Sequence, residues 1–171
     1  IGARAAFVRQ FRTTWLVKHA FYRCFSEYVK RSLDKSGELN ASMVSQWAQN
    51  NGKGLKELNM TDNILGDGGA RGIAKLIRAN HKGLTCINLS SSKIGDAGAR
   101  AIGKALEGNT TLEILDLGKN EFGDPGVVAI GKALKGNTTL KTLNLHEAKI
   151  SELGAKVLIP FIQIVLSSFG E

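Results

Sequence analysis

Apolar side chains recur along this chain in a pattern that returns every 28 or 29 residues. In the clearest copy they occupy Leu112, Leu115, Leu117 and Phe122, with Asn120 just before the last. The other copies are Leu55, Leu58, Met60, Asn63 and Leu65; Leu84, Ile87, Leu89, Ser92 and Ile94; and Leu140, Leu143, Leu145, Ala148 and Ile150. A period of this length is typical of proteins built from stacked repeats.

Within each repeat the pattern changes from that of a strand to that of a helix. Alternating apolar positions predict a short strand whose leucines face inward. A Gly-Asp turn follows, and we expect Asp67, Asp96 and Asp124 to cap the helices that begin there. Apolar residues at helical spacing come next, and Gly108 and Gly136 are expected to close two of these helices. Each repeat then forms a right-handed β–α unit of a parallel sheet.

The pattern L-x-x-L-x-L-x-x-N-x-L-G-D-x-G-A resembles the ribonuclease-inhibitor type of leucine-rich repeat, over residues 55–155. The resemblance implies a horseshoe with strands on the concave side and helices on the convex side. The resemblance also implies a protein-interaction scaffold, since members of that family include inhibitors, GTPase-activating proteins, innate sensors, actin regulators and organellar assembly subunits. Ser92 and Ala148 occupy positions where the pattern has the turn Asn, and Glu152 occupies the position of the Asp. Pro160 is expected to kink or end the last helix.

The expected fold class is α/β, a right-handed leucine-rich-repeat solenoid with a short parallel sheet, outer helices and an N-terminal helical extension. We divide the chain into a basic aromatic amphipathic helix (1–33), a linker with a capping helix (34–53), four repeats (54–156) and an apolar C-terminal cap (157–171). Helix 1–33 is expected to cap the repeats, dock into a partner's groove or lie on a membrane. The apolar end either covers the last repeat or is buried in a neighbouring protein.

The formal charge of +8 is concentrated at the N-terminal end of the sequence. Residues 1–53 carry nine Lys and Arg against three acidic residues, and the first acidic residue is Glu27. This Arg-rich, amphipathic composition is typical of mitochondrial targeting segments, so we expect a mitochondrial location, with the cytoplasm or another organelle as alternatives. No apolar run reaches the ~18 residues that span a bilayer.

No arrangement typical of catalysis or metal binding occurs in the sequence. His19, His81 and His146 fall on different predicted elements, and no HExxH, GxSxG or CxxC motif is present. The glycine-rich turns recur once per repeat, so the repeat explains them better than a phosphate loop does. We therefore expect no enzyme activity, no cofactor, no metal and no small-molecule substrate. Cys24 and Cys86 are expected to be reduced thiols.

Three glycosylation sequons begin at Asn40, Asn109 and Asn137. The last two occupy equivalent positions in the return between repeats. We interpret all three as unmodified turns.

Four groups of residues are candidate contacts for partners, although solvated or core-forming roles are also open for most of them. On the N-terminal helix they are Arg4, Phe7, Arg9, Phe11, Arg12, Trp15, Lys18, Tyr22 and Phe25. On the strand side they are Asn59, Asn88, Asp116 and Asn144. On the helix side they are Lys75, Lys104 and Lys132, and in the apolar end Phe161 and Ile164.

Three functions fit these features. The first is a structural or assembly subunit of a large, mitochondrial multiprotein complex, anchored through residues 1–33 and 157–169 to other protein subunits. The second is a regulatory module, inhibitor-like or GTPase-activator-like, that binds a protein on its concave face. The third is a ribosome-associated protein whose basic helix contacts RNA.

Overall fold

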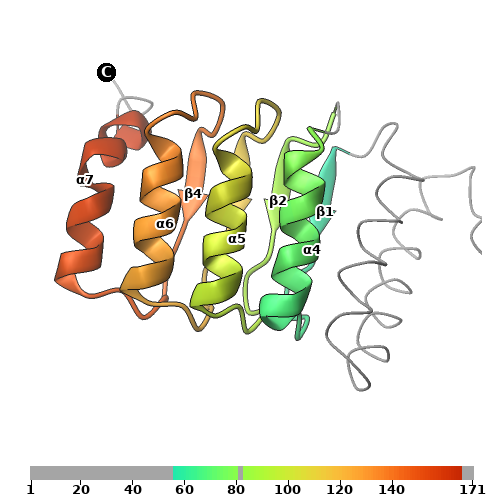
Figure 1. The fold of residues 1–171 in the computed structure, drawn as a ribbon, viewed down its shortest axis with the longest axis horizontal. Coiled ribbons are helices and arrows are strands. Elements are labelled where there is room, and N and C mark those ends of the chain that lie inside the picture. The colour runs from blue at the N-terminus through green and yellow to red at the C-terminus, as the bar shows by residue number, and fades with distance from the viewer. Residues whose placement is uncertain (1–55, 81–82, 167–171) are drawn as a thin grey trace, which may run out of the picture.

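Four strands and four helices alternate along the repeats (Figure 1). The computed structural model describes residues 56–80 and 83–166, and for residues 161–166 only the course of the helix. The predicted segments 1–33 and 34–53 lie outside the described residues. The elements are β1 (Glu57–Asn59), α4 (Gly66–Arg78), β2 (Cys86–Asn88), α5 (Asp96–Leu106), β3 (Ile114–Asp116), α6 (Asp124–Leu134), β4 (Thr142–Asn144) and α7 (Glu152–Leu166).

The four strands form one parallel sheet in the order β1-β2-β3-β4. Their register places Leu58, Ile87, Leu115 and Leu143 side by side, one from each repeat. The helices lie next to one another on one side of this sheet (Figure 1). The α/β solenoid of stacked repeats is therefore confirmed.

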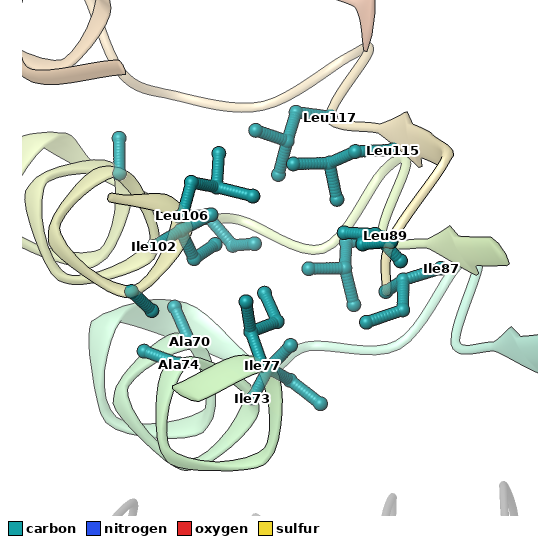
Figure 2. Close-up of a cluster of buried hydrophobic side chains, with 14 of the residues drawn as sticks. Ala70, Ile73, Ala74, Ile77, Ile87, Leu89, Ile102, Leu106, Leu115 and Leu117 are labelled. Atoms are coloured by element: carbon teal, nitrogen blue, oxygen red, sulfur yellow. The ribbon is translucent and has the colours of Figure 1, made fainter. Parts of the chain in front are cut away.

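The core lies between the strands and the helices, where side chains of neighbouring repeats point toward one another (Figure 2). Ile73 and Ile77 of α4 and Ile102 of α5 point toward Ile87 and Leu89, which lie on the strand side. All of these side chains are buried. Burying one such side chain stabilises the fold by about 1.5–3 kcal/mol. The apolar period thus stabilises the stack, because each repeat covers the next.

The turn asparagines bind the backbone of two repeats at once. The buried Asn120 donates from Nδ2 to the carbonyls of Leu117 and Leu89, at 2.9 Å each. Its Oδ1 accepts from the backbone N–H groups of Ser92 and Ile94 at 3.1 and 3.0 Å. The expected role of this amide, satisfying backbone groups where the chain turns, is confirmed. Ala148 in the last repeat has no amide to continue the series.

The turn aspartates do not cap their own helices, so that expectation was wrong. Asp67 Oδ1 accepts from the N–H groups of Gly95 and Gly98, at 2.8 Å each, and both glycines lie at the start of α5. Asp96 Oδ1 likewise accepts from Gly123 and Gly126 at the start of α6. Each carboxylate therefore caps the helix of the next repeat. A negative charge is stabilised there because unpaired N–H groups point toward it.

The return after each helix carries a second set of connections, in the opposite direction. Asn109, which follows α5, donates from Nδ2 to the Ile77 carbonyl of α4 at 2.7 Å. Asn137, which follows α6, donates to the Leu106 carbonyl of α5 at 2.8 Å. Both asparagines are buried. Neither Gly108 nor Gly136 has the left-handed backbone of a glycine cap, so these amides replace the expected caps.

The last repeat is less covered than the others. Leu143 and Leu145 of this repeat are only half-buried, and Leu153 and Ile159 of α7 are 73% and 57% exposed. Pro160 does not end α7, which continues to Leu166 and bends near its C-terminal end (Figure 1). The described residues therefore leave apolar surface at this end of the stack.

Candidate protein-binding faces

The strand face consists of the outward side chains of the four strands and the turns that follow them. The predicted column of Asn59, Asn88, Asp116 and Asn144 is brought together here by the parallel register. Its neighbours on the strands are Glu57, Cys86, Ile114 and Thr142, and on the turns Thr61, Ser90, Gly118 and His146. The face is mostly polar, and its charges are few.

Hydrogen bonds fix the Asn and Asp column in place. Each Oδ1 accepts the backbone N–H two residues later, so the side chain closes a local turn. These distances are 3.0 Å from Asn59, 2.9 Å from Asn88, 2.9 Å from Asp116 and 3.1 Å from Asn144. The column is thus part of the turn structure, and its remaining polar atoms are held at fixed positions on the surface.

The C-terminal part of this face contains a connected row of three side chains. Asn144 Nδ2 donates to Asp116 Oδ2 at 3.1 Å, and His146 Nδ1 lies 2.9 Å from Asn144 Oδ1. The imidazole lies directly over Gly118, where a Cβ would overlap it. Gly118 therefore makes room for His146.

Ile114 is the large apolar side chain at the centre of the strand face. It is 43% exposed and lies between Cys86 and Thr142 in the register. Burial, and then the carboxylates of Glu57 and Asp116, raise the pKa of the Cys86 thiol. Cys86 is therefore a neutral thiol near neutral pH, and with Ile114 it forms an apolar spot among polar groups.

The helix face carries the predicted row of lysines. Lys75, Lys104 and Lys132 are exposed at equivalent positions of α4, α5 and α6, and Arg71 and Arg100 form a second row. No described carboxylate forms an ion pair with any of these five cations. Neighbouring helices lie about 8–10 Å apart, so the charges repel one another and favour an anionic surface nearby.

The remaining predicted contacts are not placed by the structure. Phe161 and Ile164 fall in α7, where side chains are not described. The contacts of the N-terminal helix lie outside the described residues, and these are Arg4, Phe7, Arg9, Phe11, Arg12, Trp15, Lys18, Tyr22 and Phe25.

Within residues 56–80 and 83–166, no three His, Cys, Asp or Glu side chains group in a way that could hold a metal ion. In the same part of the chain, no helix is long and apolar enough to cross a membrane. The described groups that do converge, the Asn and Asp column and the capping carboxylates, bind backbone N–H groups. Their arrangement stabilises the turns after the strands and the starts of the helices.

The parallel strand order and the alternating helices define the class of the protein as a repeat solenoid. The sequence pattern named Leucine Rich repeat matches residues 55–74, 82–103, 108–131 and 136–158, over half of the chain. The chain therefore belongs to the leucine-rich repeat family. Whether its repeats are of the ribonuclease-inhibitor type stays a prediction.

Among solved structures, the chain is similar to one described as leiomodin-1 actin-binding site 2. The two share 22% identity, the match covers 71% of this chain and 70% of that one, and the TM-score is 0.61. This likeness is one of fold. The comparison with curated protein sequences gives no match.

Proposed function

We propose that the chain is a non-catalytic protein-interaction scaffold that binds a partner protein with its strand face. The observation that carries the proposal is the exposed Ile114 on the strand face, in the column next to the hydrogen-bonded Asn and Asp side chains. A central apolar contact surrounded by fixed polar groups is the usual arrangement of a protein interface. Because the polar groups are already ordered, binding costs little further side-chain entropy.

The test compares two charge-introducing variants of the full chain. Ile114→Glu places a carboxylate at the centre of the strand face, and Lys104→Glu makes a comparable change on the helix face. Both positions are exposed, so neither variant is expected to lose more than about 0.5 kcal/mol of stability. Partner capture should fall at least about tenfold for Ile114→Glu and stay unchanged for Lys104→Glu. Equal capture by wild type and Ile114→Glu would refute the proposal.

We further propose that the partner is another subunit of a large, mitochondrial assembly. This finer proposal is supported by the Arg-rich, aromatic pattern of residues 1–33, which combines the composition of a targeting segment with an apolar stripe. Deleting residues 1–33 should release the protein from a high-molecular-weight mitochondrial fraction. A deletion variant that stays in that fraction, or a wild-type protein outside mitochondria, would contradict it.

Actin and RNA are two alternatives to a mitochondrial protein subunit as the partner. Actin is included as a candidate because the structurally similar chain is described as an actin-binding site. RNA is included because residues 1–33 are basic, and RNA binding would weaken steeply between low and physiological salt. Capture that survives nuclease and physiological salt would favour a protein partner.

A further inference from the structure

The outward surface of helices α4, α5 and α6 is the most positively charged part of the described repeats. Seven exposed Lys and Arg side chains lie on these helices or directly after them, with one exposed acidic side chain, Glu107. They occupy equivalent helix positions in three rows: Arg71 and Arg100; Lys75, Lys104 and Lys132; and Arg78 and Lys135. Elsewhere in residues 56–80 and 83–166, ten acidic residues outnumber six Lys and Arg. The charge is therefore unevenly divided between the helix face and the rest of the repeats.

Helix stability does not account for this surface. Arg71 and Lys75 of α4 are four residues apart, as are Arg100 and Lys104 of α5, and like charges at this spacing destabilise a helix. The helix dipole favours cations in the last turn, but Arg71 and Arg100 precede it. No described carboxylate forms an ion pair with any of the seven cations. An anionic ligand against this face would relieve the repulsion between them.

The starts of α5 and α6 are already occupied by negative charge. Asp67 accepts from the first N–H groups of α5, and Asp96 does the same for α6. Such N–H groups would otherwise be a place for a phosphate group in a fixed orientation. The anion contacts are therefore left to the long Lys and Arg side chains, which favour a high density of negative charge.

The cationic surface has no apolar or aromatic anchor. Among the described residues, the exposed large apolar side chains are Ile64, Ile114, Leu153 and Ile159, and none of them lies on α4, α5 or α6. These three helices also contain no aromatic residue. A protein partner would normally bury an apolar core, and single-stranded nucleic acid would stack on aromatic rings. The surface fits neither of these ligands well.

The cations are spread over a broad layer, because the helices lie side by side on one side of the sheet (Figure 1). Neighbouring helix axes are about 8–10 Å apart, so the row of Lys75, Lys104 and Lys132 extends about 16–20 Å. A planar array of headgroups can meet all three rows at once. The curved surface of a nucleic-acid duplex falls away from the outer rows. Membranes that contain anionic lipids attract clusters of Lys and Arg in this way.

We propose that the face formed by α4, α5 and α6 binds the surface of a membrane that contains anionic phospholipids. The three helices lie parallel to the membrane plane, and their Lys and Arg side chains contact the headgroup phosphates. The strand face, on the other side of the repeats, then points away from the membrane, so Ile114 stays accessible to a protein. This inference does not depend on what the strand face binds.

The test is co-sedimentation of the full chain with phosphatidylcholine vesicles that contain about 30% phosphatidylserine. The triple variant Lys75→Gln/Lys104→Gln/Lys132→Gln removes the middle row of charge and keeps side chains of good helix propensity. Each cation near an anionic surface contributes roughly a fivefold factor in binding. This variant should therefore bind at least about tenfold more weakly than wild type.

The matched control is Lys56→Gln/Lys93→Gln/Lys149→Gln, which removes the same charge from exposed positions outside the helix face. Both variants keep the basic residues 1–33, so any binding by that segment is equal in the two. The control should stay within about threefold of wild type, since its charges lie away from the membrane. Circular dichroism spectra like that of wild type are required of both variants.

Equal losses in the two variants would overturn the proposal, because the helix face would then matter no more than any other cations. Equal binding of the wild-type chain to vesicles without phosphatidylserine would overturn it as well. A wild-type chain that ignores the vesicles but binds duplex RNA or an acidic protein through the same lysine row would assign the face to that ligand instead.

A photoreactive amino acid reports the orientation on the vesicles independently. Placed at position 104 it should crosslink to lipid, and placed at position 114, on the strand face, it should not. Lipid crosslinks from position 114 with none from position 104 would place the wrong face on the membrane and overturn the proposal.

Discussion

At the scale of single residues, polar side chains fix the spacing between repeats. Asn120 illustrates this role, because its buried amide bonds three carbonyls and two N–H groups from two repeats. Apolar burial alone has no direction, so it could not set the angle between one turn and the next. Hydrogen bonds to buried backbone groups are directional, so they can set this angle. Leaving such groups unpaired costs about 1–3 kcal/mol each.

Replacing Asn120 with Ala is therefore expected to be strongly destabilising. The variant loses the amide and leaves several buried backbone groups without partners, so the free energy of unfolding should fall by about 3 kcal/mol or more. Urea denaturation measures this change. Glu121→Ala, at the exposed neighbouring position, is the control and should stay within about 0.5 kcal/mol of wild type. Similar losses for both variants would mean that the amide does not connect the repeats.

The roles of the Asp side chains could be predicted from the sequence only in part. The Gly-Asp turn before a helix indicated a cap, and a cap is what the carboxylate provides. The partner was wrong, because Asp67 reaches the helix of the next repeat rather than its own. Local patterns describe neighbours in sequence, whereas this contact joins residues 28 and 31 positions apart.

At the scale of elements, neighbouring helices pack closely because small residues lie between them. A Cβ at Gly103 would come within 2.9–3.0 Å of the backbone of Ala129 and Ile130 in α6. At Gly108, beyond the end of α5, a Cβ would meet nothing within 4 Å. A side chain therefore has no room at position 103 but has room at position 108, although both glycines belong to the same repeat.

Gly103→Ala is expected to push α5 and α6 apart and to lower the free energy of unfolding by about 1–3 kcal/mol. Gly108→Ala should leave it unchanged or raise it slightly, because alanine restricts the unfolded chain. Thermal unfolding of the two variants beside wild type measures the difference. If Gly103→Ala unfolds like Gly108→Ala, the close packing of the helices is not required.

The contact between Asp124 and Ser151 that attaches α7 to the stack should weaken at acid pH. The hydroxyl and then the backbone N–H of Ser151 hold the pKa of Asp124 below its ordinary value. A lowered pKa in the folded state means that the contact stabilises the fold above the unfolded pKa of about 3.9. The stabilisation is lost as the pH falls through the lower folded value.

The chemical shift of the Ser151 amide should therefore move in this acidic range, below the ordinary pKa of Asp. Asp124→Asn keeps an acceptor oxygen but removes the charge, so the same amide should show no such transition. A transition at the ordinary pKa of Asp in the wild-type chain would contradict the contact.

The elements themselves were largely predictable, because the apolar period identified every strand and helix of the described repeats. At Pro160 the last helix was expected to kink or end, and α7 does not end there but bends near its C-terminal end (Figure 1). Proline removes one backbone donor and disturbs one turn, and α7 continues to Leu166 across that disturbance.

At the scale of the whole molecule, the repeats give three different surfaces. The strand face is polar around Ile114, the helix face carries rows of Lys and Arg, and β4 forms one edge of the described sheet. The sequence predicted the first two, since equivalent positions in each repeat align in space.

The central claim is that the strand face is where this module binds another protein. Site-specific photo-crosslinking tests it most directly, with a photoreactive amino acid placed at Ile114 in one sample and at Lys104 in another. We expect position 114 to capture a defined protein other than the chain itself and position 104 not to capture it. Capture of the same protein from position 104, with none from position 114, would contradict it.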